Sequence, residues 1–408
     1  MPKLLFWLAA ALLLPAVARA ALPGPWVEFG ADGELSIRTV VARGVACPHV
    51  EIDGSDVAMA PRGKPDAAFP VEICEARALA AAHRLSLAGQ PLPVVRGAIR
   101  RIVVLGDTGC RVEGKAAQSC NDPAAWPFAA VARRAAARKP DLVIHVGDYY
   151  YRESPCPAGN TGCTATPHGD NFPAWQADFF DPAAPLLAAA PWVMTRGNHE
   201  LCRRGGRGWF RLLDPHPPAE GCADTSEPYW AAAGGVSLAV FDSADADDFR
   251  TDPAKVAVFA KQLAALLAGV PAHTWLVTHR PVWALAQGNL PGVPMNLTNQ
   301  AAIRGHFSRD LDLVISGHLH DFTSYDFGGS HPAQLIAGTG GDTLLPAASA
   351  PLVGAEIDGA TVQKGMILAQ FGYFVMEREG EGWAGTFYGP DDAVLATCRV
   401  AGRELDCR

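Results

Sequence analysis

The sequence has little charge, and the charge that it carries is mostly negative. Only 19% of its 408 residues are charged, and 34 Lys+Arg stand against 42 Asp+Glu, which gives a formal net charge of −8. This acidic balance argues against a scaffold for nucleic acid, because such proteins neutralise phosphates with Lys and Arg. Since 49% of the residues are hydrophobic, the composition also excludes a disordered chain, a coiled coil and a collagen-like fibre. We therefore expect a soluble globular protein with a sizeable core.

Long hydrophobic runs are missing beyond the N-terminus, because Gly, Pro or charge interrupts each later apolar stretch before it could span a bilayer. One short run, Leu4–Leu14, follows Lys3 and precedes small residues at 18–20. This pattern is typical of a cleaved signal peptide over residues 1–20, and an uncleaved amphipathic anchor is the alternative. No Cys lies near the cleavage point, so we predict a secreted or periplasmic protein without a membrane anchor.

Spacing of the CxxC type is absent, which argues against a cysteine zinc site. All 10 cysteines follow residue 20 and fall into neighbouring pairs. In an oxidising compartment such pairs indicate disulfides that close loops. The sequence does not fix the connectivity, and pairing between neighbours is the simplest choice. It joins Cys47 to Cys74, Cys110 to Cys120, Cys156 to Cys163, Cys202 to Cys222, and Cys398 to Cys407.

Residues 21–98 predict a small all-β domain. Its short strand-like runs are broken by Gly and Pro clusters. They lie at Glu34–Val41, Pro48–Asp53 and Leu85–Val95. Helical periodicity in this region is confined to Cys74–His83.

Residues 99–408 predict α/β layers, because apolar β-rich runs alternate there with Ala-rich helical stretches. Phe128–Arg138 is one such helix. Pro253–Leu267 is another, with Asp252 as its N-cap and Pro at its first position. The C-terminal part returns to strands that should close a second sheet. They are Met366–Glu377, Gly382–Tyr388 and Ala393–Val400.

Side chains that bind metals follow five of the expected strands. They are Asp107 after Ile102–Leu105, Asp148 after Leu142–Val146, Asn198 after Trp192–Thr195, His279 after Trp275–Val277, and His318 with His320 after Leu311–Ile315. Because ligands of open α/β sheets gather at the carboxyl ends of strands, we expect these clusters to converge. A glycine directly precedes four of these residues and lets the strand turn sharply. Oxygen donors and imidazoles suit divalent and trivalent first-row metals and exclude a soft thiolate site.

Each cluster alone has an ordinary structural explanation, since a Gly-Asp pair is usually a turn and a lone His often fills a core. Five clusters in this order would have to coincide by chance. Together they resemble the calcineurin-like binuclear metallophosphoesterases, and among these most of all the purple acid phosphatases. The resemblance rests on Asp107, Gly147-Asp148-x-x-Tyr151, Gly197-Asn198-His199-Glu200, His279 with the following Arg-Pro-Val-Trp, and Gly317-His318-x-His320.

The resemblance implies a two-sheet β-sandwich flanked by helices, with residues 99–408 as the catalytic domain. It also implies two metal ions bridged by Asp148, namely Fe(3+) and a divalent Zn, Fe or Mn ion. The implied ligands are Asp107, Tyr151 and His320 for one ion, and Asn198, His279 and His318 for the other. A metal-bridging hydroxide would attack a small phosphoester. His199 would then bind a phosphoryl oxygen or protonate the leaving group.

Several residue roles keep an alternative. His199 is also consistent with a buried structural histidine that Glu200 orients. Tyr151, one of three consecutive tyrosines, either ligates the trivalent ion or only packs. Arg280 and Arg196 flank the ligands, and each either contacts phosphate or is a structural arginine.

The leading prediction is an exported, purple-acid-phosphatase-like phosphomonoesterase. The loop Ala284–Asn289 lacks a histidine that family members commonly carry, and Asp321–Tyr325 differs from the family's usual continuation, so the substrate class stays open. The alternative within this chemistry is a phosphodiesterase that acts on nucleotides or lipid head groups. The alternative of another class is a catalytically inactive binding protein that retains the fold, and the complete ligand set argues against it. The oligomeric state is not predicted.

Overall fold

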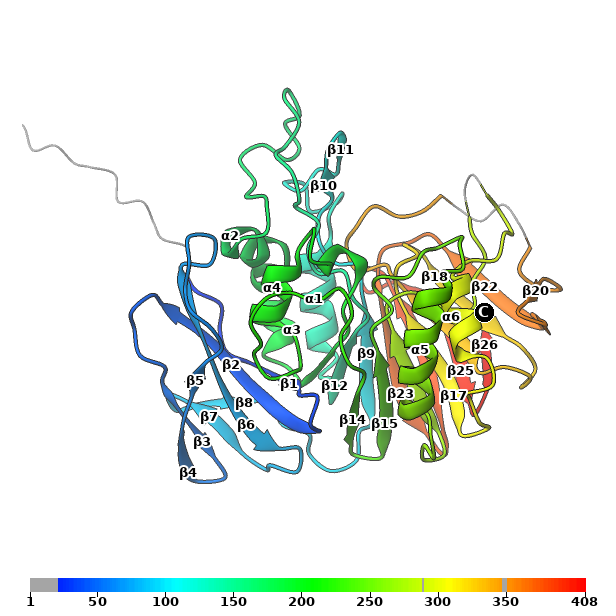
Figure 1. Ribbon diagram of the computed structural model, residues 1–408, viewed down its shortest axis with the longest axis horizontal. Coiled ribbons are helices and arrows are strands. Elements are labelled where there is room, and N and C mark those ends of the chain that lie inside the picture. Colours follow the sequence, from blue (N-terminus) through cyan, green and yellow to red (C-terminus); the bar gives the residue numbers. More distant parts are fainter. Residues whose placement is uncertain (1–20, 288–289, 347–350) are drawn as a thin grey trace, which may run out of the picture.

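The computed structural model describes residues 21–287, 290–346 and 351–408. Two large β-sheets pack face to face around a shared hydrophobic core, and helices cover the outer face of each sheet (Figure 1). This arrangement confirms the predicted α/β sandwich. Within the described ranges no helix is long and apolar enough to cross a membrane. The predicted signal peptide lies outside the described residues.

The first sheet has 11 strands in the order β26-β25-β24-β23-β9-β12-β13-β1-β2-β6-β5. Its parallel centre consists of β9 (Arg101–Leu105), β12 (Leu142–His145) and β13 (Trp192–Met194). C-terminal strands extend one side, namely β23 (Tyr373–Glu379), β24 (Gly382–Tyr388), β25 (Val394–Ala401) and β26 (Glu404–Cys407). N-terminal strands extend the other side, namely β1 (Trp26–Phe29), β2 (Glu34–Ala42), β5 (Ala60–Pro61) and β6 (Val71–Leu79).

The second sheet has seven strands in the order β14-β15-β16-β17-β19-β18-β22. Its parallel strands are β15 (Val236–Phe241), β16 (Thr274–Thr278), β17 (Leu311–Ser316) and β19 (Ala333–Ala337). Antiparallel partners at its sides are β14 (Tyr229–Ala233), β18 (Phe322–Asp326) and β22 (Lys364–Leu368). The carboxyl ends of the parallel strands in both sheets therefore supply the loops at one end of the sandwich.

The single strand predicted at Met366–Glu377 is wrong, because it is two strands that belong to different sheets. The chain leaves β22 in the second sheet and enters β23 in the first sheet through residues 369–372. Gly372 is the last residue of this crossing. A Cβ atom on this residue would lie only 2.2 Å from the Tyr388 carbonyl oxygen, so the position requires glycine. The strands that follow it pair beside β9, so they widen the first sheet rather than close a second one.

Helices on the first sheet include α1 (Phe128–Ala137), α2 (Phe172–Trp175), α3 (Asp181–Leu187) and α4 (Gly206–Leu212), with a π-helical turn at Gln176–Phe180. The second sheet is covered by α5 (Pro253–Leu266) and α6 (Leu297–Ile303). The Asp252 carboxylate accepts hydrogen bonds from the first backbone N–H groups of α5, as predicted for an N-cap.

The N-terminal region is rich in strands and hydrogen bonds directly to the central sheet. Strand β1 pairs in parallel with β13, and β2 continues the sheet outward. A separate four-stranded sheet comprises β4 (Ser55–Ala58), β3 (His49–Ile52), β7 (Leu85–Leu87) and β8 (Gln90–Leu92). A domain boundary at residue 98 stays a prediction.

The helical segment predicted at Cys74–His83 is wrong, because residues 71–79 form strand β6. This strand pairs with β2 over its full length, and the disulfide from Cys74 to Cys47 fixes it further. Tertiary pairing has here overridden a local periodicity that favoured a helix.

All five predicted disulfides between neighbouring cysteines are present. Cys110–Cys120 and Cys156–Cys163 close loops that follow β9 and β12. The first of these loops contains the hairpin of β10 (Val112–Glu113) and β11 (Ala116–Ala117), and a similar small hairpin, β20 (Glu356–Ile357) with β21 (Ala360–Thr361), follows β19.

Candidate metal centre

The five clusters that follow the strands converge at one end of the sandwich, and sharp backbone turns bring them together. Asp107, Asp148 and His318 all have a left-handed backbone, with φ of 55°, 59° and 70°. Non-glycine residues pay about 1–3 kcal/mol each for sparsely populated backbone conformations, which persist mainly at functional sites. A Cβ on Gly197 would lie 2.1 Å from Asp148 Oδ1, and one on Gly317 would lie 2.3 Å from Asp107 Oδ2. These glycines are therefore required by the close approach of the carboxylates.

The first half of the centre gathers around the Tyr151 phenol. Its hydroxyl donates a hydrogen bond of 2.8 Å to Asp148 Oδ2 and lies 3.2 Å from Asp107 Oδ1. The same oxygen is 3.1 Å from Nε2 of His320, which in turn is 3.3 Å from Asp107. All four side chains are buried. The structure thus brings together the three side chains predicted for one ion and the predicted bridge.

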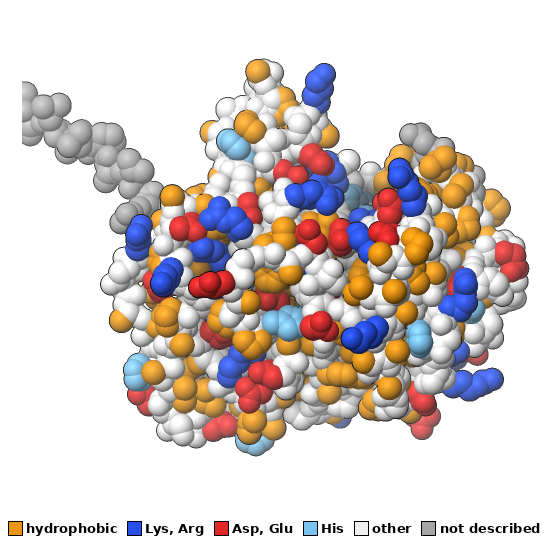
Figure 2. Space-filling view, viewed as in Figure 1, with side chains coloured by type: hydrophobic (Ala, Val, Ile, Leu, Met, Phe, Trp, Pro, Cys, Tyr) orange, Lys and Arg blue, Asp and Glu red, His pale blue; other side chains and the backbone are white. Residues whose placement is uncertain are grey.

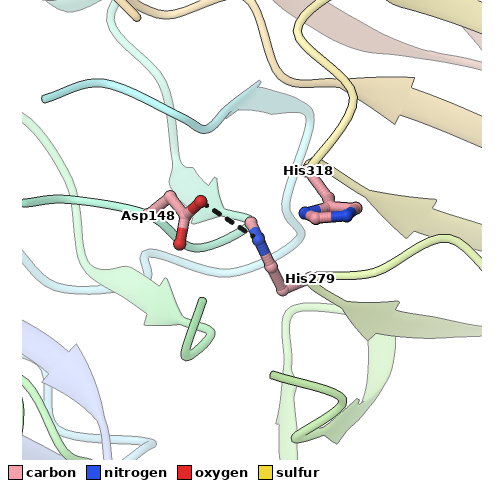
Figure 3. A group of neighbouring side chains, drawn as sticks. All are labelled: Asp148, His279 and His318. Carbon is pink, nitrogen blue, oxygen red and sulfur yellow. Dashed lines mark ion pairs between the residues drawn. The ribbon is translucent and has the colours of Figure 1, made fainter. Parts of the chain in front are cut away.

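The second half also adjoins Asp148 and contains Asn198, His279 and His318. Nε2 of His279 is 3.0 Å from Asn198 Oδ1 and 3.3 Å from Asp148 Oδ2. The rings of His279 and His318 are 5.2 Å apart, and Figure 3 shows His318 beside the ion pair of Asp148 and His279. Two groups of side chains could each hold a metal ion, one with Asp148, His279 and His318 and the other with Asp107, Asp148 and His320. Within each group the donor atoms lie within 4.8 Å of one another, and Asp148 belongs to both groups. Its carboxylate is placed to serve two ions.

Each imidazole is oriented by a partner on its outer ring nitrogen. Nδ1 of His279 lies 2.8 Å from the Val146 carbonyl oxygen, and Nδ1 of His320 lies 2.7 Å from that of Thr343. Because a carbonyl only accepts, each Nδ1 carries the hydrogen and each Nε2 offers its lone pair to the centre. In His318 the order is reversed, since Nε2 lies 2.8 Å from both Asp248 Oδ1 and Arg280 Nη1, and Nδ1 is the nitrogen that remains for a metal. Such outer hydrogen bonds are typical of metal-binding histidines.

The charges in the centre are those of a site built for cations. Burial disfavours a charged His279, but the Asp148 carboxylate raises the pKa of this histidine to about 9. The carboxylates of Asp342 and Asp107 likewise overcome burial and raise the pKa of His320 to about 9. Burial and the carboxylates of Asp148, Asp107 and Asp342 raise the pKa of Tyr151 well above its usual value. The phenol therefore needs a strong Lewis acid to ionise, and the donor set as a whole fits two metal ions.

Two carboxylates behind the histidines were missed by the sequence reasoning. Asp248 contacts His318, and the guanidinium of Arg280 pairs with Asp248. Asp342 Oδ2 lies 3.4 Å from Nδ1 of His320, and Arg111 pairs with Asp342 at 2.5 Å. Both aspartates follow strands of the second sheet, β15 and β19. The rule that ligands gather at strand ends could have drawn attention to them.

The two arginines that flank the ligands have structural partners. Nη1 of Arg280 lies 2.8 Å from Nε2 of His318, and its Nε donates to the Ala244 carbonyl. Arg196 donates to the carbonyl oxygens of Glu200 and Ala223 and so ties the turn after β13 to a distant loop. Phosphate binding by Arg280 stays a prediction.

His199 lies against the centre with Nε2 turned toward it, 3.9 Å from Asp148 Oδ2. Its ring packs on Tyr151 with the centroids 3.7 Å apart. Glu153 orients it through a contact of 2.6 Å to Nδ1, and Glu153 is itself held by Arg204 at 2.7 Å. The alternative that Glu200 orients this histidine is wrong.

Glu200 instead braces the backbone of the turns. Its carboxylate accepts hydrogen bonds from the backbone N–H groups of Gly197, Asp148, Tyr149 and Tyr150. These bonds tie the turn after β12 to the turn after β13. Glu200 therefore holds Asp148, the predicted bridge, and Asn198 in register.

Comparison with known proteins now places the chain in a family. Residues 100–322, more than half of the chain, match the model of the calcineurin-like phosphoesterases. Purple acid phosphatase PPD1 from yellow lupin (Lupinus luteus) seeds is similar in fold, with a TM-score of 0.59 and 14% identity over 91% of this chain and 72% of that chain. The structure of PhoD gives a TM-score of 0.56 and 11% identity over 96% of this chain and 93% of that chain. No curated protein matches. The chain therefore belongs to the calcineurin-like phosphoesterase family, whose members are metal-dependent enzymes that hydrolyse phosphoesters.

Proposed function

We propose that the protein is an exported phosphomonoesterase of the purple acid phosphatase type. The observation that carries this proposal is the position of the Tyr151 hydroxyl, within 3.2 Å of Asp107, Asp148 and His320. A tyrosine among the ligands distinguishes an Fe(3+) site from one that holds only divalent ions, because a trivalent ion best stabilises the phenolate. The five disulfides support export, since such bonds persist in oxidising compartments.

Asp107, Tyr151 and His320 would hold Fe(3+), and Asn198, His279 and His318 would hold Zn, Fe or Mn, with Asp148 shared. Two bound cations supply Lewis-acid charge that neutralises the phosphate and lowers the pKa of a water molecule. The amide of Asn198 adds no negative charge, so this half of the centre stays attractive to an anionic phosphoester. The glycines keep the two halves close enough to share Asp148.

His199 would act on the substrate rather than on the metals. Its Nε2 faces the centre. The Glu153 carboxylate lies 2.6 Å from Nδ1 and so keeps a hydrogen on that nitrogen. In the imidazolium form, whose charge the Glu153 carboxylate would stabilise, Nε2 can donate a hydrogen bond to a phosphoryl oxygen or a proton to the leaving alcohol. No protein nucleophile is required.

The decisive experiment compares monoester and diester hydrolysis by the metal-loaded protein. We expect kcat/KM for p-nitrophenyl phosphate to exceed that for bis(p-nitrophenyl) phosphate, with Asp148→Asn as the inactive control. A preference for the diester would instead support the phosphodiesterase alternative. Two bound metals without turnover of either ester would support the inactive binding protein.

A further inference from the structure

Asp178 is a fully buried carboxylate that contacts the turn of Tyr151 but belongs to neither group of possible metal ligands. Figure 2 shows many charged side chains on one face of the molecule, where water can solvate them. A side chain with 0% exposure has no such contact with water. Buried charges of this kind are found where hydrogen bonds and an opposite charge take the place of water. The partners of Asp178 therefore indicate its role.

The Asp178 carboxylate joins the turn after β9 to the turn after β12. Its Oδ1 accepts hydrogen bonds from the backbone N–H of Cys110 at 2.9 Å and from Nε of Arg152 at 2.7 Å. Its Oδ2 accepts from the backbone N–H of Tyr151 at 2.7 Å. The buried guanidinium of Arg152 balances the negative charge. Because both turns carry predicted metal ligands, this one carboxylate links two of the turns that build the centre.

Gly109 shows how closely the carboxylate and the phenol ring approach the same backbone. A Cβ atom on this residue would lie 2.8 Å from Asp178 Oδ2 and 2.8 Å from Cδ2 of the Tyr151 ring. Only glycine therefore fits against both of them. The beginnings of the two turns are held separately, since the backbone N–H of Asp107 donates to the Gly147 carbonyl at 2.9 Å. Asp178 thus secures the later part of the two turns, where Tyr151 lies.

A π-helical turn brings Asp178 to this position. Helix α2 leads into the turn Gln176–Phe180, and the turn leads into α3 without a break. Such turns are rare within helices and frequent at functional sites. Asp178 and the next two residues are all buried, although three consecutive side chains of a regular α-helix spread over about 200° around its axis. Phe179 packs on the ring of Tyr149 with the centroids 5.0 Å apart. The turn therefore directs a carboxylate and an aromatic ring to the loop after β12.

We propose that Asp178 is a positioning residue for Tyr151 and holds the phenol where it binds the Fe(3+) ion. This inference rests on the proposed function, and in particular on the Fe(3+) site. Glu200 braces the turns after β12 and β13 through backbone N–H groups, but its contacts stop at Tyr150. Asp178 extends this support by one residue, to Tyr151, and to the turn after β9. The Tyr151 hydroxyl is thereby kept 3.2 Å from Asp107 Oδ1.

Asp178→Asn tests the proposal, because this variant keeps the shape of the side chain but has only one acceptor oxygen. That oxygen can accept from both Cys110 and Arg152, which leaves the amide NH2 group facing the N–H of Tyr151. In the iron-loaded variant we expect less phenolate-to-iron absorption per bound iron. We also expect the affinity for Fe(3+) to fall by about 10–100-fold, while the affinity of the second half for Zn stays at the wild-type level.

Asp170→Asn is the matched control. The Asp170 carboxylate likewise accepts from two backbone N–H groups and one side chain, but these belong to Arg207 and Gly208 of α4 and to Trp175. This variant should keep the wild-type absorption and iron affinity. The proposal would be overturned if a folded Asp178→Asn variant matched the wild type, if it lost both metals equally, or if Asp170→Asn lost as much iron absorption as Asp178→Asn.

Arg152→Lys gives a milder test if Asp178→Asn does not fold. It keeps the buried pair of charges but loses the hydrogen bond from Nε that orients the carboxylate. We expect iron affinity to fall in this variant too, and a folded variant with wild-type iron affinity would overturn the proposal. A wild-type protein that binds Fe(3+) without colour would instead overturn the proposed function.

Discussion

The two halves of the metal centre share Asp148 but differ in the charge of their own ligands. Asp107 and Tyr151 give the first half a carboxylate and an ionisable phenol, whereas Asn198 gives the second half a neutral amide. The hydrogen-bond support is nearly symmetrical, since an aspartate–arginine pair backs one histidine in each half. Asp342 with Arg111 backs His320, and Asp248 with Arg280 backs His318. The difference in charge, rather than in support, is what should assign a trivalent ion to the first half.

The largest effect is expected from the residue that both halves share. Asp148→Asn should deplete both metals and abolish most activity, because one oxygen of the carboxylate becomes a neutral amide group at the bridge. The loss should exceed the roughly 10–100-fold that follows removal of an outer partner. Metal analysis and kcat/KM should fall together. Full metal content with low activity would show that Asp148 is not a bridge.

His199 belongs to neither half and should separate turnover from metal binding. His199→Ala should lower kcat with an alkyl phosphate by about 10²–10⁴-fold if it transfers a proton, while metal content stays at the wild-type level. The matched variant Glu153→Gln should lower kcat less, because it only loosens the orientation of the ring. Full turnover by His199→Ala would remove this residue from the mechanism.

Asp248 and Asp342 test whether each half of the centre depends on the aspartate that contacts its histidine. Asp342→Asn and Asp248→Asn should each weaken metal binding by about 10–100-fold, but each in its own half. Titration of the metal-free variants with Fe and Zn should therefore show one weakened site in each case, and a different one. If both variants weakened the same metal, the division of the centre into these halves would be wrong.

Substitution of Tyr151 should change turnover least, but it should change the visible absorption of the iron-loaded protein most clearly. Iron-loaded protein should be pink to violet through phenolate-to-iron charge transfer, and Tyr151→Phe should bleach it. Tyr150→Phe is the control, since the Tyr150 hydroxyl donates to the Arg152 carbonyl and lies outside the centre. A colourless wild-type protein that contains ferric iron would refute phenolate ligation.

The sequence was informative wherever short-range chemistry decides the structure. Glycine followed by a polar residue at the end of a buried strand is a local pattern, and it located Asp107, Asp148, Asn198 and His318. His279 and His320 also lie at strand ends, whereas Tyr151 was assigned through the family resemblance.

Asp248 and Asp342 also follow strands, but they lie several residues beyond the strand ends, so their contacts with His318 and His320 depend on the paths of the loops. The contact of Glu153 with His199 depends on a loop path in the same way. The strand β6 was mistaken for a helix for a related reason, since its pairing with β2 is a tertiary interaction.

Metal stoichiometry measured together with activity tests the central claim most directly. Metal-free protein should be titrated with Fe(3+) and then with Zn, with hydrolysis of p-nitrophenyl phosphate followed at each step. The account predicts two equivalents bound per chain and activity that appears only as the second site fills. Full activity at one equivalent, or activity that survives complete removal of metal, would contradict a binuclear phosphoesterase.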